Sequence, residues 1–248
     1  MVETSRFSEW DVQGDIGILT INNPPQNYLK ELEFVDLEDL EKWTKGSSLK
    51  GLILMGKGRH FCAGAVQDNI FQFHNEEAIQ NTLRKGKAIL DYIQNLPIPT
   101  VAAINGACLG GGLEVALACH IRVCSETSFL SFPETGLKVM PGLNGTLEAP
   151  KKAGLCNAIE MILTSKMINA QEALKMGFVD HVVPGKEVFS FSMNFLKRLT
   201  EDRPLYLIHA VMDAINDSRR MKTDDAIEKA SKTFCKLAAE IVQKQKNV

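Results

Sequence analysis

The sequence predicts an α/β fold in which buried strands alternate with amphipathic helices, followed by a mainly helical C-terminal part. Two observations support this class. Short β-rich runs and helical runs alternate between residues 8 and 132, and helical periodicity dominates from about residue 143. Such alternation is typical of α/β proteins with crossover connections. Since no linker or low-complexity segment separates the parts, the simplest organisation is one core domain with a helical C-terminal extension.

The predicted strands are short apolar runs in the first part of the chain. Residues 16–22 (IGILTIN) and 49–56 (LKGLILMG) are two of them, and the second is too apolar to expose either face. Residues 100–106 (TVAAING) form another buried strand. Residues 120–126 and 128–132 complete the β portion.

Two long helices are predicted among these strands. Residues 29–45 place apolar side chains close to helical spacing, and residues 75–96 form a second amphipathic stretch. Asn75 is a suitable N-cap for the second helix, and Pro97 is a stop. Shorter or later helices are expected at about 112–118 and at 143–153, 155–164, 170–176, 186–200, 204–217 and 223–245, with a brief strand-like stretch at 178–184.

Composition excludes several classes of protein. The chain has 248 residues, 45% hydrophobic and 23% charged, as is ordinary for a globular protein. A net charge of −2 gives no general attraction to nucleic acid or to an anionic membrane. No run approaches the roughly 18 apolar residues that a membrane helix needs. The polar, acidic N-terminal residues resemble neither a secretory signal nor a typical transit peptide, so a cytoplasmic location is expected.

Cysteine and histidine residues show no metal-binding pattern. The six cysteines are scattered, mostly among apolar neighbours, and we expect buried free thiols. Cys119 and Cys124 have no second pair at metal spacing, and the histidines form no motif such as H-E-x-x-H. We therefore expect no metal.

Three stretches carry candidate chemistry. In GACLGGGLEVALACH (106–120), glycines between a strand and an apolar helix would leave free N–H groups able to hold developing negative charge, beside Glu114. Tight packing of a turn would need the same glycines, so this stretch alone leaves both interpretations open. GKGRHFCAGAVQD (56–68) also follows a buried strand and offers bare amides around Ala63 to Ala65. SFPETGLKVMPGLNGT (131–146) adds Glu134, which by itself resembles a solvated loop acid.

Taken together, these stretches resemble the crotonase, or enoyl-CoA hydratase/isomerase, superfamily. The matching pieces occur in family order at residues 60–65 (HFCAGA), 98–123, 132–146 and 168–184. The resemblance implies a crotonase-like spiral of ββα units in residues 1–190. It also implies a C-terminal helical region, residues 191–248, that contributes to oligomerisation, usually as a trimer or a dimer of trimers.

The resemblance also assigns the site. Ala65 and Gly111 match the two positions whose backbone N–H groups form the family's oxyanion hole, while Glu114 and Glu134 match its two catalytic glutamates. Substrate or coenzyme A binding is assigned to Ala63, Gly64, Val66, Gly110, Lys57 and Arg59. Lys57 and Arg59 are candidates for the phosphate-bearing nucleotide portion, although ordinary surface charges would look the same. No separate cofactor is expected, because coenzyme A or the phosphopantetheine of an acyl-carrier protein is part of the substrate.

The presence of both glutamates narrows the reaction. Adding water to an enoyl thioester needs a base that takes a proton from water and an acid that protonates the α-carbon. A double-bond isomerase can use one base as a proton shuttle. The sequence therefore favours hydration, or dehydration in reverse. Isomerisation, decarboxylation or another lyase reaction on the same thioesters is the alternative, and an inactive binding or assembly protein of the same fold is the third possibility.

Some residues depart from the family pattern near the acyl group. Val66 stands where an aspartate is common, His120 where an acid is frequent, and Asn144 and Glu148 lie in a run that usually reads Gly-Gly-Thr-Gln-Arg. We expect His120 to be a structural histidine with satisfied hydrogen bonds. The other changes suggest a specialised acyl group, or a substrate tethered to a carrier protein.

Overall fold

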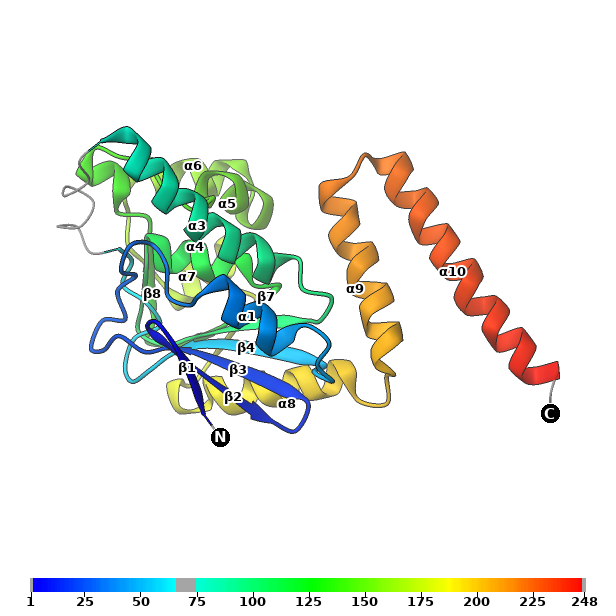
Figure 1. The fold of residues 1–248 in the computed structure, drawn as a ribbon. Helices are drawn as coiled ribbons and strands as arrows, with labels where there is room; N and C mark the ends of the chain where they lie inside the picture. Colours follow the sequence, from blue (N-terminus) through cyan, green and yellow to red (C-terminus); the bar gives the residue numbers. More distant parts are fainter. Residues whose placement is uncertain (1, 66–74, 247–248) are drawn as a thin grey trace.

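The main sheet has an antiparallel edge and a parallel centre, as the computed structural model of residues 2–65 and 75–246 shows (Figure 1). Within these residues, the strand order is β1-β2-β3-β4-β5-β7-β10. The strands are β1 (Glu3–Ser5), β2 (Ser8–Gln13), β3 (Ile16–Ile21), β4 (Gly51–Gly56), β5 (Thr100–Ile104), β7 (Ile121–Ser125) and β10 (His181–Val183). From β3 to β10 all pairs are parallel. The α/β class and the predicted strands are confirmed.

A second, smaller sheet follows the turns at the ends of the main strands. It pairs β6 (Ala107–Leu109), β8 (Phe129–Ser131) and β9 (Ile168–Asn169). A bridge between Cys62 and Cys108 and another between Leu29 and Ala65 continue this pairing toward the N-terminal loops. After β5 and β7 the chain thus runs through a short second strand before the next helix, and after β3 and β4 the isolated bridges take the place of that strand, which is the expected spiral. The sequence analysis did not predict β6, because its residues lie within the glycine-rich run.

The helices cover both faces of the main sheet. In Figure 1, α3, α4, α5 and α6 lie on one side and α8 on the other. The helices are α1 (Leu37–Thr44), α3 (Glu76–Gln94), α4 (Gly111–Ala118), α5 (Gly145–Ala153), α6 (Leu155–Thr164), α7 (Ala170–Met176), α8 (Val188–Thr200), α9 (Leu205–Arg220) and α10 (Thr223–Lys246), with 3-10 turns η1 (Glu134–Leu137) and η2 (Gly185–Glu187). Asn75 caps α3 by accepting from the Ala78 amide, as predicted.

Alternating side chains of β4 divide the core into two layers. Ile53 faces α8 together with Val101 of β5, whereas Leu52 and Leu54 belong to the larger cluster on the other face. All of these side chains are buried. A strand covered on both sides has no solvent-facing positions, so β4 reads as a continuous apolar run.

The helix predicted over residues 29–45 begins only at Leu37, so its first part is wrong. Residues 29–36 form a loop instead, in which the Leu29 amide donates to the Gly64 carbonyl. Glu31 and Leu32 have positive φ angles, which an α-helix does not accommodate. Tertiary pairing with the Gly64 loop therefore overrides the helical spacing of the apolar residues.

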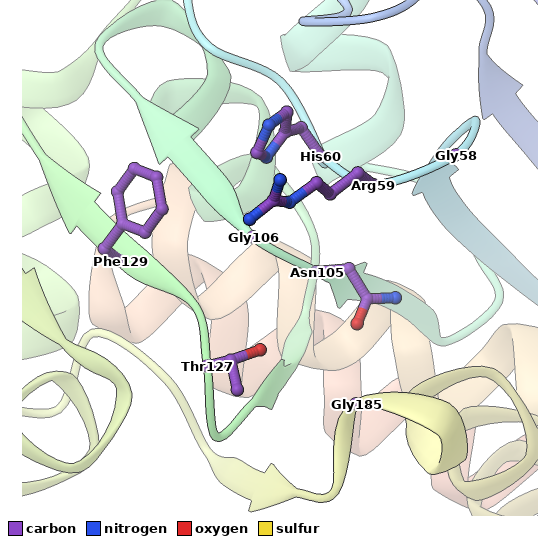
Figure 2. Close-up of a pocket in the computed structure, with 8 residues that line it drawn as sticks. All are labelled: Gly58, Arg59, His60, Asn105, Gly106, Thr127, Phe129 and Gly185. Atoms are coloured by element: carbon purple, nitrogen blue, oxygen red, sulfur yellow. The ribbon is translucent and has the colours of Figure 1, made fainter.

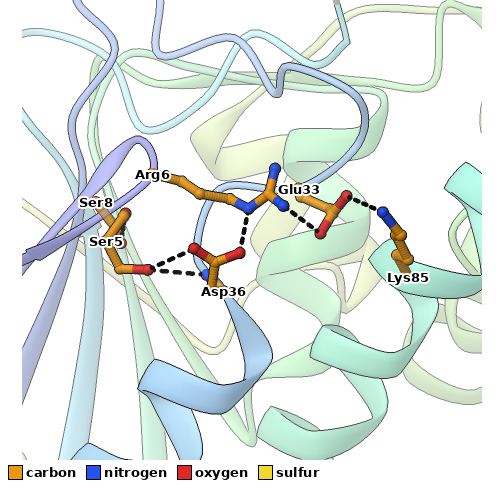
Figure 3. Close-up of polar contacts among 6 residues, drawn as sticks. All are labelled: Ser5, Arg6, Ser8, Glu33, Asp36 and Lys85. Carbon is orange, nitrogen blue, oxygen red and sulfur yellow. Dashed lines mark hydrogen bonds and ion pairs between the residues drawn. The ribbon is translucent and has the colours of Figure 1, made fainter.

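Polar contacts fix this loop to the N-terminal hairpin and to α3 (Figure 3). Arg6, at the β1–β2 turn, pairs with Asp36 and lies 3.4 Å from the carboxylate of buried Glu33. Lys85 of α3 approaches the other oxygen of Glu33 at 3.8 Å. The Ser5 hydroxyl donates to the Asp36 carboxylate. Glu33 is thus compensated from both sides, and the loop holds Leu29 in place.

The C-terminal helices leave the sheet after α8. That helix packs on β4, β5 and β7 and contains the boundary that the sequence analysis placed after residue 190. Helix α10 packs on α9 and lies away from the sheet in Figure 1. Both helices expose large apolar side chains, including Tyr206, Val211, Ile227 and Phe234. Their role in oligomerisation stays a prediction.

His120 has the structural role expected from the sequence. Its Nδ1 interacts with the Thr100 hydroxyl and accepts from the Thr100 amide, and its Nε2 lies 3.4 Å from Asn216 of α9. Burial lowers the pKa of His120 to about 4. The expectation for the cysteines is partly wrong. Four are buried, but Cys156 and Cys235 are exposed, because they lie on the outer faces of α6 and α10.

Helix α4 packs closely against the Phe61–Ala65 segment at Gly112. A Cβ atom at this position would lie 2.3 Å from the Cys62 carbonyl oxygen, which belongs to the backbone and cannot rotate away. We expect Gly112→Ala to lower the free energy of unfolding by about 1–3 kcal/mol. Gly136→Ala is the control, since its Cβ would meet only ordinary contacts at 3.5 Å. Urea denaturation measures both, and equal stabilities would contradict the assignment.

Candidate active site

Two loops meet where the short second strands end. The Leu109 amide donates to the Cys62 carbonyl, and the Cys62 amide donates to the Ala107 carbonyl. A Cβ atom on Gly64 would lie 2.9 Å from the Leu109 carbonyl oxygen. The pairing therefore brings the loop after Cys62 against the start of α4.

The Ala65 and Gly111 amides are neighbours at this junction. A Cβ atom added to Gly64 would lie 3.7 Å from the Gly111 nitrogen, and one added to Gly111 would lie 4.0 Å from the Ala65 nitrogen. Within residues 2–65 and 75–246, neither amide donates a hydrogen bond. Gly111 is the first residue of α4, where the helix itself provides no acceptor. Among the residues that the structure describes, nothing occupies either N–H group, and an oxygen atom placed between the loops could accept from both.

The neighbouring small residues shape the turns around these amides. Gly64 has φ +93° and Gly110 has φ +49°, conformations that residues with a Cβ rarely adopt. The Gly110 amide donates to the Ser131 carbonyl, and the Ala63 amide donates to the Gln26 carbonyl. Val66, which the sequence analysis assigned to the same loop, lies outside the described residues.

Glu114 points from the fully buried helix α4 to the loop that precedes α5. Its Oε1 accepts from the amides of Leu143 and Gly145, both at 2.7 Å. Burial raises the pKa of Glu114 to about 7, and the negative charge of Glu134 adds to this rise, while the two amides oppose it. A carboxyl group in an apolar helix with such a pKa can either accept or donate a proton near neutral pH.

Glu134 reaches the same place from η1. A Cβ atom on Gly110 would lie 2.6 Å from its Oε1, so a larger residue at that position would displace this carboxylate. Its buried Oε2 has no hydrogen-bond partner among the described residues. Burial raises the pKa of Glu134 to about 7. The structure thus brings Glu114, Glu134 and the Ala65 and Gly111 amides together around Gly110 and Gly111.

The sequence analysis missed the amides of Leu143 and Gly145, which hold Glu114. Backbone groups leave little trace in a sequence, but the Asn144-Gly145 dipeptide is a usual sign of a tight turn. A Cβ atom on Gly145 would lie 2.9 Å from Glu114 Oε1, which explains why a glycine occupies this position.

Arg59 lies at the start of β6, at the other end of that strand from Gly110. The Lys57 ammonium group pairs with Glu9 of β2. Arg59 lines a cavity of about 320 Å³ with His60, Asn105 and Thr127 (Figure 2). The residues that line this cavity do not include Ala65, Gly111, Glu114 or Glu134. The assignment of Lys57 and Arg59 to the nucleotide portion of a substrate stays a prediction.

Two further properties of the described residues bear on function. Residues 2–65 and 75–246 contain no cluster of three histidine, cysteine, aspartate or glutamate side chains suited to a metal ion. In the same part of the chain, no helix has both the length and the hydrophobicity to cross a bilayer.

Comparison with known proteins gives consistent matches. The sequence profile of the enoyl-CoA hydratase/isomerase family matches residues 11–246. The fatty acid oxidation complex subunit alpha of Shewanella frigidimarina is 41% identical over 189 residues, which is 74% of this chain and 27% of that protein. The subunit from Idiomarina loihiensis is 38% identical over 226 residues, or 88% and 32% of the two chains. The chain spans about a third of the length of these curated relatives.

Solved structures show the same fold. An enoyl-CoA hydratase from Bacillus anthracis superimposes with a TM-score of 0.84 at 28% identity, covering 92% of this chain and 90% of that one. DspI of Pseudomonas aeruginosa gives a TM-score of 0.87 at 25% identity, covering 95% and 90%.

The half-buried carboxyl of Glu134 should make folding stability depend on pH. Its pKa rises from an ordinary 4.5 to about 7 in the folded protein, so the native state binds more protons than the unfolded chain between these values. Stability should therefore fall as pH rises through this window. Glu134→Gln removes the carboxyl group whose ionisation lowers stability. At pH 8 the free energy of unfolding of this variant should therefore be about 2–3 kcal/mol higher than that of the native protein.

Urea denaturation at pH 4.5 and pH 8 measures this difference. The opposite contribution of His120, whose pKa burial lowers to about 4, is common to both proteins and cancels. Exposed Glu77→Gln is the control for loss of one surface carboxylate. An advantage of Glu134→Gln that is no larger at pH 8 than at pH 4.5 would contradict the assignment.

Proposed function

Because the chain belongs to the enoyl-CoA hydratase/isomerase family, we propose that it catalyses reversible hydration of an α,β-unsaturated acyl thioester. The observation that carries this proposal is the pair of carboxyl groups, Glu114 and Glu134, each with a pKa raised to about 7, beside two amides that donate no hydrogen bond among the described residues. Hydration needs one ionised and one protonated group at the same pH, and the pair supplies both.

Glu114 is the base in this proposal. Two amide donors on Oε1 stabilise its ionised form and fix the side chain, which leaves Oε2 to accept a proton from water. The resulting hydroxide adds to the β-carbon of the substrate as the proton passes to Glu114. The π electrons of the double bond move toward the thioester carbonyl, whose oxygen becomes an enolate.

Glu134 is the acid. Its Oε2 is buried without a hydrogen-bond partner in the described part of the chain, a setting that favours the neutral carboxyl group. It gives its proton to the α-carbon as the enolate collapses to the saturated thioester. The product is a 3-hydroxyacyl thioester, and proton exchange between the carboxyl groups and solvent restores the starting state. Dehydration follows the same path in reverse.

The Ala65 and Gly111 amides stabilise the enolate oxygen. Two donors from separate loops, whose nitrogen atoms lie close together, can converge on one oxygen. Loss of one such donor in other enzymes reduces the rate by about 10²–10³-fold. Ala63, Gly64, Val66 and Gly110 would line the substrate beside them.

The names of the curated relatives favour a fatty enoyl group as substrate. The thioester carrier is coenzyme A or an acyl-carrier protein, and Lys57 and Arg59 are the proposed contacts for its phosphates. We further propose assembly as a homotrimer or a dimer of trimers, which would cover the apolar side chains that α9 and α10 expose.

Double-bond isomerisation is the second candidate, because a single held base such as Glu114 can move a proton between two carbons. The two reactions differ in their need for Glu134. If the protein hydrates enoyl thioesters, Glu134→Gln and Glu114→Gln should each lower kcat by about 10²–10⁴-fold. If it is an isomerase, Glu134→Gln should retain most activity while Glu114→Gln should not.

A panel of 2-enoyl, 3-enoyl and 3-hydroxyacyl thioesters measures these rates, each presented on coenzyme A and on acyl-carrier protein. Exposed Glu77→Gln serves as the matched control. Turnover of crotonyl-CoA at ordinary hydratase rates would overturn the expectation of a specialised or carrier-bound substrate. Absence of turnover across the panel, with thioester binding retained, would indicate the third possibility, an inactive binding protein.

The pH dependence of hydration should be bell-shaped. Below pH 7 the pair becomes doubly protonated and the base is lost, and above pH 7 both groups ionise and the acid is lost. The maximum of kcat/KM should therefore lie near pH 7. The residual activity of Glu134→Gln should lose the alkaline limb, because that variant has no acid to ionise. An alkaline limb that persists unchanged in the variant would refute the assignment of Glu134 as the acid.

A further inference from the structure

The turn that holds Glu114 has an unusual backbone at its centre. Asn144 lies between the two residues whose amides bind Glu114 Oε1, and it has φ +87° and ψ 9°. Its carbonyl accepts from the Leu147 and Glu148 amides at 2.9 Å, which starts helix α5. Asn144 therefore connects the carboxyl-binding turn directly to a rigid element.

The handedness of residue 144 decides where both flanking amides point. Successive N–H groups converge on one anion when the backbone between them changes hand, as in anion-binding nests. With residue 144 in the left-handed region, Leu143 and Gly145 donate to the same oxygen atom. Rotation of residue 144 into the right-handed region would turn one amide away from Glu114. Asparagine tolerates the left-handed region better than most residues, and glycine does so without steric cost.

The Asn144 side chain adds a contact to α3. Its Nδ2 donates to Asp91 Oδ1 at 3.4 Å, a long hydrogen bond at an exposed position. Partial burial and the nearby Glu148 carboxylate raise the pKa of Asp91. Because this contact is long and solvent-accessible, it should contribute less than the backbone conformation.

We propose that Asn144 is a positioning residue, whose left-handed backbone aims the Leu143 and Gly145 amides at Glu114. This inference rests on the proposed function for its effect on catalysis, but not for its effect on the Glu114 carboxyl group. The charged groups that act on Glu114 from the surrounding elements are Glu134 of η1 and Lys87 of α3. Substitution of Asn144 leaves both in place, so a change in Glu114 titration would come from the turn.

Three variants separate backbone from side chain. Asn144→Ala removes the side-chain contact and disfavours the left-handed backbone, Asn144→Gly removes the contact but keeps the backbone, and Asp91→Ala removes the contact alone. Infrared spectroscopy measures the titration of the Glu114 carboxyl group in the absence of substrate, and Glu114→Gln assigns its band. This titration reports whether the turn still donates to Glu114. Thermal unfolding of each variant verifies that the fold is retained.

In Asn144→Ala we expect Glu114 to titrate at a pH about half a unit to one unit higher, since one of the two amides no longer stabilises its ionised form. Its kcat for hydration at pH 7 should fall about tenfold with little change in KM, because base strength and placement change while substrate contacts remain. Asn144→Gly and Asp91→Ala should stay within about twofold of the native protein in kcat.

Unchanged Glu114 titration in Asn144→Ala would overturn the inference. So would equal effects of Asn144→Gly and Asn144→Ala, because the side-chain contact would then carry the effect. If Asn144→Ala does not fold, an altered Glu114 titration in Asn144→Gly overturns the inference, while an unaltered titration supports it. The expected titrations in a protein that hydrates no thioester would leave this inference standing and refute the proposed function instead.

Discussion

The backbone pairing between Cys62 and the Ala107–Leu109 strand is the constraint on which the rest of the site depends. It closes the corner between the main sheet and the small second sheet, and it brings the Ala65 and Gly111 amides from distant parts of the chain side by side. Because α4 starts directly after this strand, the same pairing also fixes the origin of Glu114. Gly112 permits the close approach, since the Cys62 carbonyl occupies the space of a Cβ atom.

Much of the fold could be predicted because its strands are covered on both faces. A parallel strand between two helical layers needs apolar residues at every position, and such runs are visible in residues 49–56 and 100–106. The loop at residues 29–36 could not be predicted in this way. Its apolar residues have helical spacing, but Leu29 pairs with the Gly64 loop and Arg6 holds Glu33, and both partners are distant in the sequence.

The candidate site likewise contains features that the sequence reveals and features that depend on tertiary structure. Some glycines are needed for a positive φ angle, such as Gly110, or for close contact with another backbone segment, such as Gly112. These glycines are conspicuous in an apolar stretch of sequence, and so are the acids beside them. The backbone amides that bind Glu114 are not conspicuous in the sequence. Leu143 acts through its backbone amide, so the identity of its side chain does not indicate its role. The proximity of Glu134 to Gly110 arises only when the chain folds.

Burial of two carboxyl groups at one point makes the site reactive and costs stability for the same reason. An apolar surrounding opposes the ionised form, which brings the pKa of both glutamates to about 7 and allows one group to stay protonated while the other is charged. The protein limits the cost at Glu114 by giving its charged oxygen two amides. Oε2 of Glu134 has no hydrogen-bond partner among the described residues. The asymmetry in hydrogen bonding, rather than any difference in residue type, is what can assign one glutamate as base and the other as acid.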